Sequence, residues 1–264
     1  MKPHLFAACA AVASLLALPG QGHAAAVVSF NIDIAGTIGG DGAVNANGQS
    51  PAGAIAGVVP VGNWTGTWNG SFQNFGPTDL IDSNGNPTTL DISGVGFGDY
   101  AISFSHPGQD TDGTWNKELI NGYMNAGASV NPQVSMFTLS EIPYAAYDII
   151  AYFTSDAAGR TGTVTDGTTT YDFTTIGAPS TAGPNALLVQ TSSTTGLNPT
   201  TNYAVFSGLS GASQVITANI PSFGGLAGIQ VVEVVPEPSS LCVLSLVSGI
   251  IALQARVRRL LPKA

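Results

Sequence analysis

The 264-residue chain contains only two cysteines, and neither lies in its central part. Cys9 and Cys242 fall within the apolar segments near the two ends. The long stretch between them can therefore form no disulfide, carries no thiol nucleophile and offers no cysteine-based metal site. A domain built from this stretch must be stabilised by its apolar core alone.

Basic residues are also scarce, with seven lysines and arginines against sixteen acidic residues and a net charge of −9. All sixteen acidic residues lie between Asp33 and Glu237, where only Lys117 and Arg160 are basic, so this stretch carries a formal charge of −14. Nucleic-acid binding requires a basic surface that neutralises phosphates and is excluded. Anionic lipid is disfavoured for the same reason, which leaves divalent cations and neutral glycans as compatible partners.

Histidine is almost absent from the middle of the chain. His4 and His23 lie near the N-terminus, and only His106 is central, before Pro107-Gly108 in an expected turn. A Ser-His-Asp triad would need His106, but no Gly-x-Ser-x-Gly elbow accompanies it. We therefore expect no catalytic residue. The alternative is a secreted polysaccharide-active enzyme with paired carboxylates, which glycosidases place about 5 to 10 Å apart.

The N-terminal segment has the composition of a secretory signal peptide. Lys2 supplies the positive charge, residues 5–18 are apolar, and small residues follow at 24–26. This order predicts a signal peptide over residues 1–26, cleaved between Ala24 and Val27. The chain is therefore expected to be exported.

The C-terminal segment combines a stiff acidic block, a short apolar run and a basic end. Val235-Pro236-Glu237-Pro238 is held extended because each proline fixes its own φ and restricts the preceding residue. The apolar run Leu241–Leu253 would make a helix of about 20 Å, whereas a bilayer core is about 30 Å thick. Extension to about residues 239–255 gives a transmembrane helix of marginal length. Arg256, Arg258 and Arg259 would remain cytoplasmic.

This tail resembles the PEP-CTERM sorting signal of bacteria, in which a Val-Pro-Glu-Pro block precedes a transmembrane stretch and an arginine-rich end. The resemblance covers residues 235–264, although the basic residues are loosely spaced and Cys242 lies within the apolar run. It implies recognition by an exosortase, a membrane-embedded transpeptidase-like enzyme, and removal of the tail. A plain membrane anchor behind a proline linker is the alternative.

Between the two ends, a period-two alternation of apolar and polar residues predicts β-strands. Residues 161–165 and 169–174 form an expected hairpin around Asp166-Gly167, and residues 147–154 form an expected central strand because they are apolar on both faces. Other expected strands are 28–34, 100–104, 186–190, 203–206, 214–220 and 228–234, with a short helix near 117–124. This pattern predicts one all-β domain over residues 27–234, an antiparallel β-sandwich or jelly roll.

Several segments of this domain are similar to uncharacterised exported proteins that bear the same sorting tail. They include Ala56–Trp64, Tyr147–Phe153 and Ala227–Glu233. Those proteins resemble galactose-binding-type jelly rolls. The resemblance implies a fold and not an activity.

Three tryptophans are candidates for glycan stacking. Trp64, Trp68 and Trp115 lie among glycine, threonine and asparagine residues. Aromatic faces stack on sugar rings while neighbouring polar side chains bind hydroxyls, a combination suited to such a site. The alternative is that these tryptophans pack in the core at strand ends.

Two acidic turns are candidates for a calcium site, and no other cofactor is expected. Asp110 and Asp112 stand two residues apart before Gly113, and Asp82-Ser83-Asn84-Gly85-Asn86 offers similar oxygen ligands. Calcium takes six to eight oxygen ligands, and neither stretch fits the EF-hand pattern. The alternative for both stretches is an ordinary Asx turn.

The sequence therefore predicts an exported bacterial protein with a β-sandwich ectodomain. The tail would anchor it in the inner membrane before processing, after which it would reach the cell surface or extracellular matrix. The expected role is structural or adhesive, for example in a biofilm matrix, through weak binding of extracellular polysaccharide. The expected partners are the exosortase, the polysaccharide and the membrane.

Overall fold

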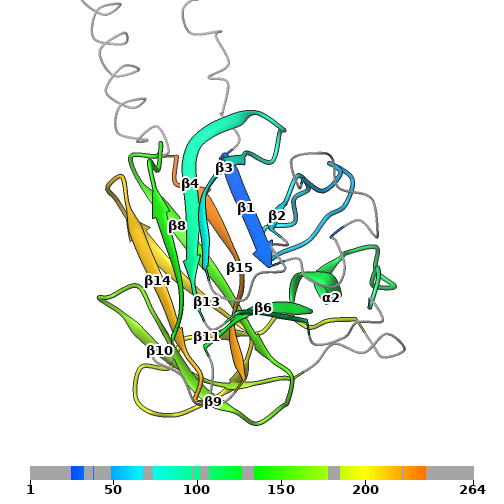
Figure 1. Cartoon of the computed structure of the whole chain (residues 1–264), viewed down its shortest axis with the longest axis vertical. Coiled ribbons are helices and arrows are strands. Elements are labelled where there is room, and N and C mark those ends of the chain that lie inside the picture. The colour runs from blue at the N-terminus through cyan, green and yellow to red at the C-terminus, as the bar shows by residue number, and fades with distance from the viewer. Residues whose placement is uncertain are drawn as a thin grey trace, which may run out of the picture.

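The computed structural model describes residues 25–32, 38, 49–67, 74–96, 98–101, 107–126, 134–177, 185–221 and 223–235. These residues form two packed β-sheets and one short helix, α2 (Asn116–Leu119) (Figure 1). The expected signal peptide and transmembrane helix lie outside them, as do Pro236, Glu237, Pro238, Arg256, Arg258 and Arg259. Within the described ranges, no helix is long and apolar enough to cross a membrane.

The first sheet has eight strands. They are β1 (Val27–Ile32), β2 (Thr65–Thr67), β5 (Gly98–Ala101), β6 (Gly122–Asn125), β8 (Tyr147–Ser155), β11 (Gln190–Thr191), β13 (Tyr203–Leu209) and β15 (Gly224–Glu233). The main order is β11-β13-β8-β15-β1-β2, and β6 pairs with both β15 and β5. The pairs β1–β2 and β11–β13 are parallel, so the sheet is mixed.

The second sheet has seven strands. They are β3 (Asn74–Ile81), β4 (Pro87–Val95), β7 (Ser135–Ser140), β9 (Thr161–Thr165), β10 (Thr170–Thr175), β12 (Thr200–Thr201) and β14 (Gln214–Asn219). Their order is β12-β10-β9-β14-β7-β4-β3, with β12 parallel to β10 and the other pairs antiparallel. Both sheets therefore mix distant parts of the chain.

The main core lies between the two sheets. Phe153 of β8 stacks on Phe173 of β10 with ring centroids 3.8 Å apart. Phe30 of β1 meets Phe137 of β7 edge-on at 5.6 Å. All four rings are fully buried, and both pairs join one sheet to the other. Burial of these large apolar surfaces holds the sheets face to face.

The outer face of the first sheet carries a second apolar cluster. Alternation along β8 directs Ile150 and Tyr152 away from the main core. Trp64 covers them from the loop before β2, and Leu119 and Ile120 cover them from the end of α2. Strand β8 is therefore buried on both faces, and its prediction as a central strand is confirmed.

A buried polar network fastens the loop before β2 onto this outer face. The Tyr152 hydroxyl donates to Gln230 Oε1 at 2.6 Å and accepts from the Val58 N–H at 2.7 Å. Gln230 Nε2 donates to the Val59 carbonyl at 2.8 Å and to the Ser29 hydroxyl at 3.2 Å. Burial raises the pKa of Tyr152, so its phenol remains a neutral donor. The first sheet is thus covered by sheet on one face and by loops on the other.

The all-β, two-sheet prediction is confirmed, while several local predictions are wrong. The expected helix near 117–124 is only α2, because residues 122–125 pair with β5 and β15 as β6. The expected strand 186–190 is reduced to β11 at residues 190–191. Five further strands, β2, β3, β4, β7 and β12, were not predicted. Part of the expected strand 100–104 lies outside the described residues.

Candidate functional site

Trp64 does not lie on the surface. Trp64 is 0% exposed, and its indole N–H donates to the Val61 carbonyl at 3.0 Å. A glycan cannot reach that ring, so the stacking prediction for Trp64 is wrong and its core-packing alternative is right. Trp115 is half-buried against the same apolar cluster, and Trp68 lies outside the described residues.

The Asp110–Asp112 stretch forms an Asx turn. Asp110 is buried, and its carboxylate accepts the Ala186 N–H at 2.7 Å and the Lys117 N–H at 3.0 Å. Asp112 accepts the backbone N–H and hydroxyl of Thr114 at 2.9 and 2.8 Å, which lowers the pKa of Asp112. The described residues contain no group of three or more histidine, cysteine or acidic side chains that could hold a metal. Asp110 thus joins two loops, and the calcium site at Asp110 and Asp112 stays a prediction.

Two adjoining hollows lie beside β9 and the loop that follows β11. The first has a volume of about 220 Å³ and is lined by Thr161, Gly162, Thr163, Asn198, Asn219 and Pro221. The second, about 560 Å³, is lined by Gln190, Ser192, Ser193, Thr194, Thr195, Leu197, Asn198 and Pro199. The hollows meet at Asn198, which lines both, and we call them together the Thr-Asn groove. Its lining carries no charged side chain.

The first hollow presents polar groups that the protein does not use. Val164 and Phe173 point into the core, so alternation turns Thr161 and Thr163 outward. Asn219 of β14 lies directly opposite Thr163. Within the described residues, the side chains of Thr161, Thr163 and Asn219 make no hydrogen bond. Two hydroxyls and an amide are therefore available to a ligand.

Neighbouring polar side chains instead make hydrogen bonds within the protein, and these bonds stabilise the groove. The Asp172 carboxylate accepts the Gly196 N–H at 2.8 Å, and the Thr174 hydroxyl donates to the Asn198 carbonyl at 2.9 Å. The Asp172 N–H donates to the Ser193 carbonyl at 2.7 Å. These bonds fix the 192–199 loop to the edge of β10. The groove wall is thus formed before any ligand binds.

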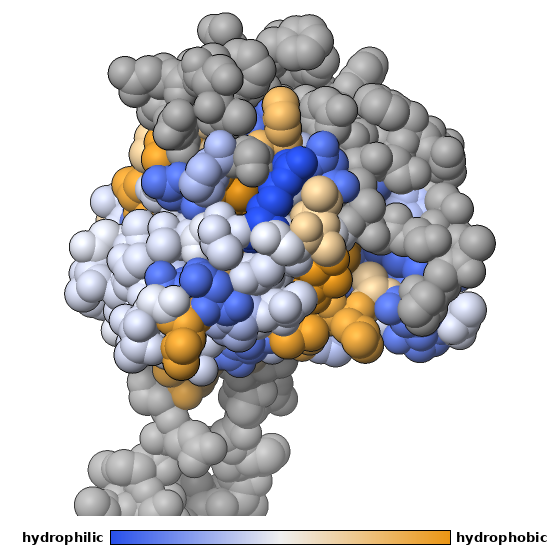
Figure 2. Space-filling model, turned by 90° about the horizontal axis from the view of Figure 1, so that it is seen from below, coloured by the Kyte–Doolittle hydropathy of each residue, from blue (hydrophilic) through white to orange (hydrophobic). Residues whose placement is uncertain are grey.

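The end of the sandwich near β9 in Figure 1 has a surface of intermediate polarity. Viewed from that end, the described surface is mostly pale, as expected for threonine, serine and glycine, with separate apolar and hydrophilic patches (Figure 2). Leu187 and Leu197 are 72% exposed, and Phe223 is 45% exposed. This end therefore combines weakly polar surface with isolated exposed apolar side chains.

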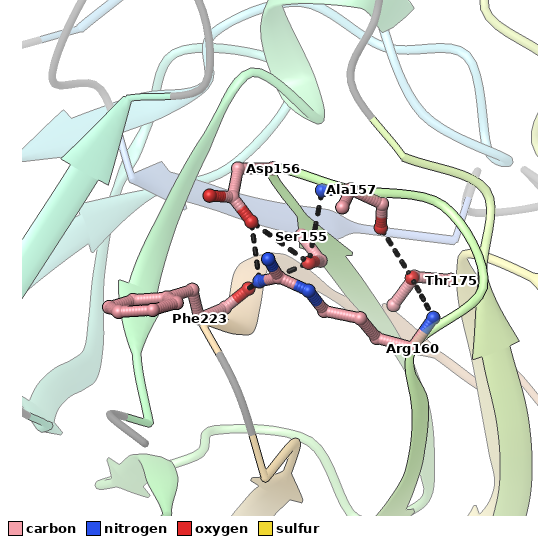
Figure 3. Close-up of polar contacts among 6 residues, drawn as sticks. All are labelled: Ser155, Asp156, Ala157, Arg160, Thr175 and Phe223. Atoms are coloured by element: carbon pink, nitrogen blue, oxygen red, sulfur yellow. Dashed lines mark hydrogen bonds and ion pairs between the residues drawn. The ribbon is translucent and has the colours of Figure 1, made fainter. Parts of the chain in front are cut away.

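Arg160 and Phe223 form a corner next to the first hollow. Arg160 directly precedes Thr161 and Phe223 follows Pro221 by two residues, while neither Arg160 nor Phe223 itself lines a hollow. The guanidinium pairs with Asp156 and donates to the Phe223 carbonyl (Figure 3). The Arg160 backbone N–H donates to the Thr175 hydroxyl at 3.1 Å, and that hydroxyl donates to the Ala157 carbonyl at 2.7 Å. The corner is therefore fixed from the backbone as well as from the side chain.

No family model matches the chain, and no curated protein and no solved structure matches it significantly. Its function must therefore be argued from its own residues.

A pair of carboxylates does occur, away from the groove. Asp79 of β3 lies directly opposite Asp91 of β4. Burial raises the pKa of Asp91, and the hydrogen bond with Asp79 and the charges of Asp79 and Glu141 raise it further. Neither hollow is lined by these side chains, so the pair does not favour the enzymatic alternative.

This pair makes a prediction about stability and pH. Folding raises the pKa of Asp91, so the protonated form of this carboxyl is the one that favours the folded state. Its contribution to stability is complete below the unfolded pKa of about 3.9. The contribution is lost as the pH rises through the folded pKa. At pH 7 two negative charges then face each other across the strands. Asp91→Asn is expected to raise the free energy of unfolding at pH 7 by about 0.5 to 1 kcal/mol, with no gain at pH 3, in urea titrations.

Asp82 provides a control, because its pKa shifts in the opposite direction to that of Asp91. Burial raises the pKa of Asp82, but hydrogen bonds from Asn86 and Asn84 outweigh it and the net pKa is lowered. Its stabilisation is present above about pH 3.9 and is lost as pH falls through the folded pKa. Asp82→Asn should therefore destabilise the protein more at pH 7 than at pH 3. A gain for Asp91→Asn that is the same at both pH values would contradict the explanation by charge repulsion between Asp79 and Asp91.

Proposed function

We propose that the protein is an exported β-sandwich that binds neutral polysaccharide in the Thr-Asn groove and acts as an adhesive or structural component outside the cell. The observation that carries this proposal is the row of unused groups on Thr161, Thr163 and Asn219 in a hollow without charged lining. Sugar hydroxyls both donate and accept, as threonine hydroxyls and asparagine amides do. A preformed wall also lowers the entropic cost of binding.

The negative charge of the protein supports the proposal that its ligand is a neutral polysaccharide. The stretch from residue 33 to residue 237 has a formal charge of −14, so an acidic polysaccharide is repelled on approach. Arg160, the basic residue beside the groove, is paired with Asp156. The corner therefore contributes little net charge to attract a carboxylate.

The C-terminal tail supports the proposed location outside the cell. Residues 235–264 resemble a PEP-CTERM signal, and on that basis we propose an exosortase as the processing partner and the extracellular matrix or cell surface as the destination. A galactose-binding-type jelly roll is our proposal for the finer classification of the sandwich. Intact-mass measurement of protein from the native envelope should show loss of residues beyond about Ser240. A mature protein that still ends in Lys263-Ala264 would contradict processing.

The binding proposal is tested with the full-length protein in detergent by affinity electrophoresis in gels containing galactomannan, dextran or alginate. Retardation by at least one of the two neutral polymers, and none by alginate, is the expected result. Thr163→Val keeps the shape and β-branching of the side chain but removes its hydroxyl. It should weaken binding about fivefold, as should Asn219→Ala, since each loses one hydrogen bond of about 1 kcal/mol.

The matched control lies at the other end of the same hairpin. Thr168 is exposed in the turn between β9 and β10, so Thr168→Val should bind as the unmodified protein does. Failure of the unmodified protein to bind any neutral polymer would overturn the proposal. Equal binding by Thr163→Val, Asn219→Ala and the control would move the site elsewhere.

A further inference from the structure

Phe223 occupies an unusual position for an aromatic residue. Its side chain is 45% exposed although its neighbours in β15 are buried. Its backbone φ is +26°, in the left-handed region that bulky residues rarely adopt. Such strain persists only where the surroundings impose it, and it concentrates at functional sites. Core packing does not explain this residue, because nearly half of its surface faces solvent.

Contacts from β8 and the segment after it impose this conformation. The Phe223 carbonyl accepts the Ser155 hydroxyl at 2.6 Å and a guanidinium N–H of Arg160 (Figure 3). The central carbon of that guanidinium lies 5.6 Å from the centroid of the Phe223 ring. Asp156 in turn pairs with Arg160. One backbone oxygen and one ring are thus held by side chains about 65 positions earlier in the sequence.

We propose that Phe223, which stands beside the Thr-Asn groove without lining it, is the sugar-stacking residue at its edge, that Arg160 positions it, and that the ligand is a pyranose with an apolar C–H face. This inference rests on the proposed polysaccharide binding and deepens it. Stacking supplies an aromatic face, which the groove lining lacks. Asp156 compensates the charge of Arg160, so the corner suits a neutral ring better than a uronate.

Phe223→Gly gives the sharpest test, because the affinity for the sugar should fall while the stability of the fold stays the same or rises. Glycine adopts positive φ without strain, so this variant should melt at the same temperature as the unmodified protein or higher. Its affinity for galactomannan should fall about tenfold, which corresponds to about 1.4 kcal/mol. Phe223→Leu, which keeps an apolar side chain without a flat face, should bind as weakly, and Phe223→Tyr should retain most of the affinity.

The positioning role of Arg160 is tested by comparing a substitution that removes its positive charge with one that keeps it. Arg160→Gln should weaken galactomannan binding and Arg160→Lys should restore much of it, because a lysine can still donate to the Phe223 carbonyl and pair with Asp156. In saturation-transfer NMR with a galactomannan oligosaccharide, the protons on one face of a sugar ring should receive aromatic saturation. Phe223→Leu should abolish that pattern.

The outcomes separate the inference from the function on which it rests. Binding that is lost in Asn219→Ala but unchanged in Phe223→Gly and Phe223→Leu would overturn the stacking role and leave the groove as the site. Stronger binding to alginate than to the neutral polymers would overturn the ligand class. Absence of binding in the unmodified protein would overturn both proposals.

Discussion

Gly225→Ala is expected to cost about 4 kcal/mol of stability or more, enough to leave much of the protein unfolded. A Cβ at this position would lie 1.7 Å from the Met124 carbonyl oxygen and 2.9 Å from Cβ of Ser135. Met124 belongs to β6, which pairs with β15 at Gly225, and Ser135 belongs to β7 of the second sheet. The methyl group can be accommodated only if strands separate at the centre of the first sheet.

The measurement is a urea titration followed by far-ultraviolet circular dichroism. Gly53→Ala is the control, because a Cβ there meets no atom within 4 Å; it should change stability by less than about 0.5 kcal/mol. A Gly225→Ala protein with near-normal stability would show that β6 can leave β15 at little cost. The position of β6 beside β15 would then need revision.

Trp64→Ala is expected to lower the free energy of unfolding by about 3 to 5 kcal/mol, the usual cost of truncating a buried aromatic side chain. The ring is fully buried, lies 6.1 Å from the Tyr152 ring and donates to the Val61 carbonyl. Its loss would leave a cavity over the outer face of the first sheet. For a domain of this size the melting temperature should fall by about 10 °C.

Trp64→Phe separates packing from ligand contact. This variant keeps part of the volume and should lose less stability, while its affinity for galactomannan should equal that of the unmodified protein. Trp115→Ala should cost less than Trp64→Ala because Trp115 is only half-buried. A loss of galactomannan affinity in Trp64→Phe without a change in melting temperature would restore Trp64 as a ligand contact.

The strands that the sequence predicts well are those with clear alternation or two apolar faces. Strands β8, β9, β10 and β14 lie within one residue of their expected bounds. Strand β4 carried the same signal, because Leu90 and Ile92 alternate with more exposed residues, and it was missed. The failure at β6 has another cause: residues 122–125 look helical with 119 and 120, but pairing with β15 decides their conformation. Tertiary pairing overrides local preference there.

The candidate site was less predictable than the fold. Trp64 has polar neighbours in the sequence, and its burial comes from a loop that folds back over Ile150 and Tyr152. Phe223 is a single aromatic residue without a local pattern, and its exposure and strain depend on Ser155 and Arg160. Contacts between residues far apart in the chain decide both cases, and composition does not encode such contacts.

The burial of Lys117 and the pairing of Arg160 also affect proteolysis. These are the only lysine and arginine between residues 3 and 255, so they are the only sites in that stretch after which trypsin can cut. Lys117 is 3% exposed, and the Arg160 side chain is 22% exposed and held by Asp156. Trypsin should therefore cleave the folded domain only when it opens, and the cleavage rate should report the population of the open form. If the protein is exported as proposed above, few and shielded cleavage sites would confer long persistence among such proteases.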